Sequence, residues 1–101
     1  SVAKAVGLSG PEGATLAEDL TTTETGVDVA TAAGHAIWIT TAANPTEFPF
    51  DIVVGGESMT VTAITGTSSP QTFTVTRSVN GVVKTHSTGA TVRLAESMFI
   101  A

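Results

Sequence analysis

The strongest constraint on the fold is a run of strictly alternating side chains in the middle of the chain. Between residues 48 and 54 every second residue is apolar: Phe48, Phe50, Ile52 and Val54. This spacing gives a β-strand one apolar face. The pair Gly55-Gly56 follows at once and suits a two-residue hairpin turn, because glycine accepts positive φ angles. Alternation resumes after the turn and is broken at Ile64, which indicates either a β-bulge or the end of the strand.

Shorter stretches of the same kind occupy much of the remaining chain, and turn residues separate them. Besides the two strands of the hairpin, strands are predicted at residues 16–24, 27–30, 36–41, 72–76 and 90–94. Threonine and valine are plentiful throughout, and both suit a half-buried pleated surface better than a helix. About seven short strands with short connections predict an all-β fold, either a small antiparallel β-barrel or a β-sandwich.

Residues 1–15 differ from the rest, because they hold small residues and glycines without a sustained period. We interpret them as an extended N-terminal arm or linker that precedes a single β-domain of residues 16–101. Two alternatives stay open for this segment. It is either a linker left from a larger chain or an arm that docks on a neighbouring subunit.

Length and composition exclude several classes of protein. The 101 residues suit one domain, and 42% hydrophobic against 13% charged residues favours a folded chain. The formal net charge is −5, and the four cations are scattered: Lys4, Arg77, Lys84 and Arg93. Such a chain is not expected to bind nucleic acid or an anionic membrane surface. Disulfides and thiolate chemistry are excluded because there is no cysteine, and no apolar stretch is long enough for membrane insertion.

The segment from Phe48 to Leu94 also carries a series of spaced residues that is recognisable. Residues 56–64 read Gly-Glu-x-Met-x-Val-x-x-Ile, and residues 74–77 read Thr-Val-x-Arg. An Asn-Gly turn at 80–81, then His86, Gly89 and a last strand with Val92 follow. This series resembles a β-domain that recurs in minor tail proteins of tailed phages that infect actinobacteria. The resemblance covers roughly the last three-quarters of the chain, with a looser fit at residues 27–31 and 37–38.

The resemblance implies a structural or assembly module of the virion tail, in contact with other tail proteins or with copies of itself. It implies no catalytic chemistry and no cofactor, and the chain would then be one domain of a longer protein. An alternative in the same setting is a host-surface or glycan-binding module at the tail tip.

Few residues are candidates for chemistry. His35 and His86 lack the spacing of a metal site, so we expect His35 in a turn and His86 bracing a loop through backbone hydrogen bonds. Glu57 is expected to accept a backbone N–H or to pair with Arg77; the functional alternative makes it one of two catalytic carboxylates with Asp51. We therefore predict no catalytic, cofactor or metal residues.

Partner contacts are predicted instead at four apolar residues. Phe48, Phe50 and Phe73 sit on apolar strand faces and are assigned to the core, whereas Trp38 opposes its apolar neighbours in the alternation. Trp38 therefore either covers one end of the barrel or contacts a partner or a glycan. The apolar C-terminal residues Met98, Phe99 and Ile100 either pack onto the barrel or contact a partner. Uncharged, threonine-rich edge strands are a further surface that a neighbour would cover.

Overall fold

The structure is a computed structural model that describes residues 13–95. The elements in this range are short: β1 (Ala14–Leu16), β2 (Gly26–Thr31), the 3-10 helix η1 (Pro45–Glu47), β3 (Phe50–Val54), β4 (Glu57–Thr65), β5 (Gln71–Thr76) and β6 (Val92–Leu94). Residues 13–95 contain no α-helix. Accordingly, no helix among them is long and apolar enough to cross a membrane.

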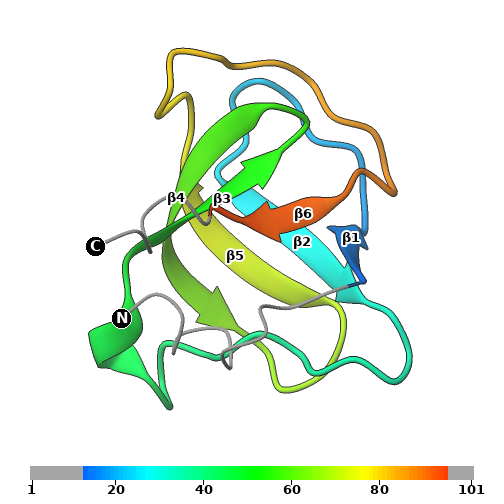
Figure 1. Cartoon of the computed structure of the whole chain (residues 1–101), viewed down its shortest axis with the longest axis vertical. Helices are drawn as coiled ribbons and strands as arrows, with labels where there is room; N and C mark the ends of the chain where they lie inside the picture. Colours follow the sequence, from blue (N-terminus) through cyan, green and yellow to red (C-terminus); the bar gives the residue numbers. More distant parts are fainter. Residues whose placement is uncertain (1–12, 96–101) are drawn as a thin grey trace.

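The six strands form one antiparallel sheet in the order β1-β2-β5-β4-β3-β6, which curls into a nearly closed barrel (Figure 1). The two outermost strands meet at a β-bridge between Thr15 and Thr91. Two backbone hydrogen bonds of 2.9 Å flank it, from Leu16 N to Ala90 O and from Gly89 N to Leu16 O. We call this contact the β1–β6 seam. The predicted all-β barrel is confirmed, with six strands in place of about seven.

The interior of the barrel is filled by the alternate residues of each strand. On β3, Phe50, Ile52 and Val54 are buried, while the intervening Asp51 and Val53 face outward. The Gly55-Gly56 turn joins β3 to β4, and both glycines have positive φ (55° and 86°) as the hairpin requires. The register of β4 against β5 shifts between Val61 and Ala63, so of the two alternatives for the broken alternation the bulge is present, and β4 continues to Thr65.

Two predicted strands differ in the structure. The first strand was expected over residues 16–24, but β1 ends at Leu16 and the threonine-rich residues after Ala17 form a loop. Side chains in this loop bind backbone groups: Asp19 accepts from Thr88 N at 2.8 Å and Glu24 accepts from Thr21 N at 2.9 Å. The local bond between Glu24 and Thr21 N competes with strand pairing, and the bond between Asp19 and Thr88 N holds the loop against the loop before β6.

The strand expected at residues 36–41 is absent, because this segment finds no strand to pair with along its length. Its backbone is held by a side chain instead. Gln71 accepts a hydrogen bond from Trp38 N at 3.0 Å and donates to Trp38 O at 2.9 Å and to Gly66 O at 3.0 Å. The segment thereby crosses one end of the barrel and carries the Trp38 ring into the core.

Candidate functional site

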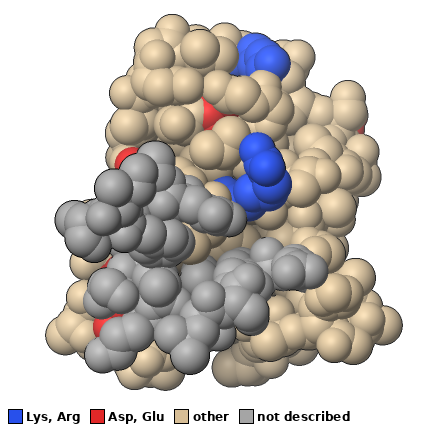
Figure 2. Space-filling model, in the orientation of Figure 1, with Lys and Arg blue, Asp and Glu red and all other residues tan. Residues whose placement is uncertain are grey.

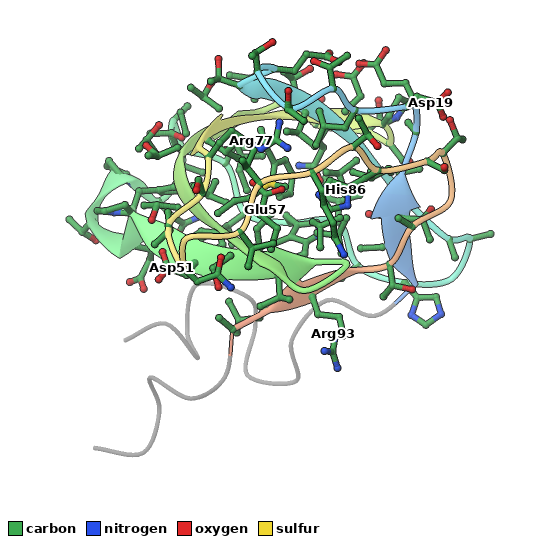
Figure 3. All side chains as sticks on the ribbon, turned by 90° about the horizontal axis from the view of Figure 1, so that it is seen from above. Asp19, Asp51, Glu57, Arg77, His86 and Arg93 are labelled. Carbon is green, nitrogen blue, oxygen red and sulfur yellow. The ribbon has the colours of Figure 1, made fainter. Side chains whose placement is uncertain are left out.

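Three polar side chains lie together inside the barrel, and we call them the polar cluster: Glu57, Arg77 and His86 (Figure 3). Glu57 begins β4 on the inward face that Met59 and Val61 continue. Arg77 follows β5 at the next position in its inward series. The exposed fractions of the three side chains are only 0%, 7% and 3%. A buried ion pair of this kind needs nearly all of its hydrogen bonds to offset the loss of water.

The guanidinium of Arg77 uses all five of its N–H groups. Nε donates to Glu57 Oε2 at 2.7 Å and Nη2 donates to Glu57 Oε1 at 3.0 Å, a bidentate pair. The remaining donors bind backbone carbonyls of the surrounding loops, at Thr21 (2.6 Å), Glu24 (2.8 Å) and Lys84 (3.0 Å). Arg77 therefore ties the loop after β1 and the loop after β5 to the same carboxylate.

The carboxylate of Glu57 is equally saturated. Besides Arg77 it accepts the backbone N–H groups of Ser78 at 3.2 Å and Lys84 at 3.3 Å. His86 Nε2 lies 2.8 Å from Oε1, and it donates there because an ionised carboxylate only accepts. Burial raises the pKa of Glu57, but the hydrogen bonds from Arg77, His86 and the two backbone groups outweigh it and lower the pKa from 4.5 to about 2.

Around the polar cluster, the loop between β5 and β6 is fixed at several points. Asn80 donates to Gly56 O at 3.0 Å and accepts from Ser58 N at 3.1 Å. The backbone of His86 pairs with Leu20 in both directions, at 2.8 and 2.9 Å. These hydrogen bonds, together with those of Glu57 and Arg77, brace the long loop between β5 and β6.

These contacts answer the sequence predictions for the two residues. Glu57 does pair with Arg77 and does accept backbone N–H groups, as expected. His86 does brace its loop, but the partner of its imidazole is Glu57 rather than a backbone group. The pairing of Glu57 with Arg77 has a signal in the sequence. Glu57 begins β4 and Arg77 follows β5, and each stands at an inward position of its strand, where an apolar residue would otherwise be expected.

The catalytic alternative for Glu57 is wrong, because Asp51 lies on the opposite face of the hairpin. Asp51 points outward from β3 and accepts a hydrogen bond from Thr60 Oγ1 at 2.7 Å, whereas Glu57 points into the barrel. A two-residue turn puts β3 and β4 side by side, but successive side chains of each strand alternate between the two faces of the sheet. Asp51 is at an outward position of β3, whereas Glu57 is at an inward position of β4. His35 lies in the exposed turn after β2, where its N–H donates to Ala32 O at 3.1 Å, as expected.

The partner contact predicted for Trp38 also needs correction, because the indole is only 1% exposed. Its ring stacks on Phe50 with centroids 6.0 Å apart and meets Phe73 edge-on at 5.2 Å. Trp38 therefore belongs to the aromatic core and offers no surface to a partner or a sugar. Its Nε1–H has no hydrogen-bond partner among the residues that the structure describes. The other predicted contacts, Met98, Phe99 and Ile100, lie outside the described residues.

No cluster of metal-binding side chains is found within residues 13–95. Comparison of the chain with known protein families, curated proteins and solved structures gave no match.

Proposed function

We propose that the chain is a non-enzymatic structural module of a phage tail, of the minor tail protein type. The observation that supports this best is a coincidence between the sequence series and the polar cluster. The series includes Glu57, Arg77 and His86, which bond one another, and Asn80, which bonds the backbone on both sides of Glu57. The polar residues that give the chain its resemblance to a tail-protein domain thus stabilise the loop between β5 and β6.

The chemistry of the polar cluster supports a structural rather than a catalytic role. A general acid or base must reach a substrate, and its pKa must lie near the working pH. Glu57 is fully buried, its pKa is lowered to about 2, and its oxygens are occupied by donors from the protein. The carboxylate is therefore ionised near neutral pH and inaccessible to a substrate.

The alternative of a glycan-binding module at the tail tip has less support. Sugar recognition commonly uses an exposed aromatic face, and the Trp38 ring is buried. The large apolar side chains exposed in residues 13–95 are aliphatic instead: Ile37, Val79, Val82 and Val83. Among the partners considered, other tail proteins or copies of this chain are accordingly preferred, and the location proposed is the virion tail.

The proposal is tested on particles of the phage whose genome encodes the chain. An antibody raised against the chain should label the tail of purified virions in electron microscopy, and peptides of the chain should copurify with the particles. An antibody against the major capsid protein serves as the control for position. If the chain is abundant in lysates of infected cells but absent from purified particles, the proposed function is wrong.

A further inference from the structure

An open hollow lies on the outer surface of the barrel beside the β3–β4 turn. Its volume is about 500 Å³, and it is lined by Val53, Gly55, Gly56, Ala90, Thr91 and Arg93. The two glycines leave the backbone of the turn bare, while Val53 and Ala90 supply an apolar floor. This hollow is separate from the polar cluster, which lies on the inner side of the same turn.

Two cations that form no ion pair within residues 13–95 border this hollow. The guanidinium of Arg93 points away from the barrel (Figure 3) and takes part in no hydrogen bond or ion pair with residues 13–95. The ammonium of Lys84 lies 4.0 Å from the place that a Cβ on Gly56 would occupy, and it has no acidic partner in this range either. On the face shown in Figure 2, basic side chains stand out from a largely uncharged surface.

A matching excess of negative charge lies on another part of the barrel. We call Glu18, Glu24 and Asp28 the acidic patch; Asp28 faces outward from β2, and the other two residues lie in the loop between β1 and β2. A hydrogen bond to Asp28 and the negative charge of that residue raise the pKa of Glu18. No Lys or Arg in residues 13–95 forms an ion pair with these carboxylates. The repulsion within the acidic patch is thus not relieved inside the described chain.

We propose that the hollow receives the acidic patch of a second copy of this chain, so that copies associate head to tail. The inference rests on the proposed role as an assembly module and names its partner. β6, which carries Arg93, and β2, which carries Asp28, lie two strands apart across the β1–β6 seam. The two halves of the contact therefore lie on different faces of one molecule, and such heterologous contacts build rings or open chains rather than closed pairs.

The charges and the apolar floor have separate tasks in this contact. Exposed ion pairs contribute only about 0–1 kcal/mol each, so Arg93 and Lys84 mainly select the partner and its orientation. The apolar surface of Val53 and Ala90 that the incoming loop covers adds to the affinity, but it is too small to hold two copies together without these charges. The association is consequently weak in dilute solution and sensitive to salt.

The test uses two variants that each weaken one half of the contact. Arg93→Glu removes the hollow's guanidinium, and Glu18→Gln/Asp28→Asn removes two of the three negative charges of the acidic patch. The matched controls Thr62→Glu and Thr62→Lys change the charge at an exposed position of β4, which lies two strands from both β2 and β6. All proteins are full-length chains, and their masses are measured by sedimentation equilibrium over a range of concentrations.

The wild type and both controls should exceed the chain mass of 10.2 kDa as concentration rises. Each variant alone should remain at the mass of one chain. An equimolar mixture of the two should form pairs and nothing larger, because only one productive contact remains between them. Raising the salt to about 1 M, where the screening length is roughly 3 Å, should weaken both the wild-type association and the mixed pair.

Three results would overturn the inference: a wild type that stays monomeric, variants that associate like the wild type, or a mixture that forms no pair. The second result would leave an assembly module that uses another surface. None of the three decides whether the chain is present in virions, which the particle labelling tests separately.

Discussion

Replacement of Glu57 by glutamine should remove a large part of the stability of the domain. Glutamine keeps the shape of the side chain, but it has one acceptor oxygen where the carboxylate offered two. The amide group would point hydrogen atoms at the donors of Arg77 or His86, which now contact both oxygens. The guanidinium, only 7% exposed, would also lose its counter-charge.

Two estimates of the cost agree. The pKa of Glu57 is about 2 in the folded protein against an ordinary value of 4.5. At 1.36 kcal/mol per pKa unit, loss of the negative charge therefore costs about 3 kcal/mol. Removal of one partner from a buried ion pair typically costs about 3–5 kcal/mol. A domain of this size is stable by about 5–15 kcal/mol, so the variant should fold but melt roughly 12–24 °C lower.

The measurement is urea and thermal unfolding at pH 7, followed by circular dichroism. Asp51→Asn is the matched control, because it makes the same chemical change on the outer face of the same hairpin and should cost less than about 1 kcal/mol. If Glu57→Gln were no more destabilising than Asp51→Asn, the polar cluster would not brace the fold as described.

Three further outcomes are expected. The pKa of Glu57 is lowered to about 2 in the folded protein, so the contribution of its charge to stability is complete above pH 4.5 and is lost between pH 4.5 and 2. The free energies of unfolding of the wild type and Glu57→Gln, measured against pH, should therefore converge over that range. A constant difference between them would contradict this expectation. Gln71→Leu should lower the free energy of unfolding by about 2–4 kcal/mol and shift Trp38 fluorescence to longer wavelength, since the backbone N–H and C=O of Trp38 lose their partner. Unchanged emission and stability would show that Gln71 does not hold the backbone of Trp38. Gly55→Ala should lower the urea midpoint more than Gly81→Ala. Both glycines have positive φ, but only at Gly55 would the new methyl group lie 3.0 Å from an imidazole nitrogen of His86. Equal midpoints would show that this contact is relieved without cost.

The parts of the fold that could be predicted from the sequence are those in which one strand carries its own pattern. The hairpin around Gly55-Gly56, the bulge before Ile64 and the inward face of β5 follow from alternation and turn residues alone. The segment 36–41 also alternates, but a strand needs a neighbour with free backbone groups. In place of a neighbouring strand, the side chain of Gln71 binds the backbone N–H and C=O of Trp38, and no local sequence pattern predicts this contact.

The polar cluster was predictable in part for a similar reason. Pairing of Glu57 with Arg77 follows from the antiparallel pairing of β4 with β5, because this pairing brings the start of β4 close to the end of β5. The contact of His86 with Glu57 depends on the path of a loop, which the sequence does not specify. The same limit applies to Trp38, whose burial is decided by how residues 36–41 cross the end of the barrel.

The β1–β6 seam has a consequence for the order in which the protein forms. Thr15 and Thr91 come from nearly opposite ends of the described chain, so the bridge between them is among the contacts with the longest intervening loop. A chain emerging from the ribosome holds β1 long before β6 exists. Until then β1 exposes one unpaired edge, and the curled sheet remains an open ribbon. Closure of the barrel is thus a late event, and amide protons of the seam should exchange with solvent earlier than those between β4 and β5.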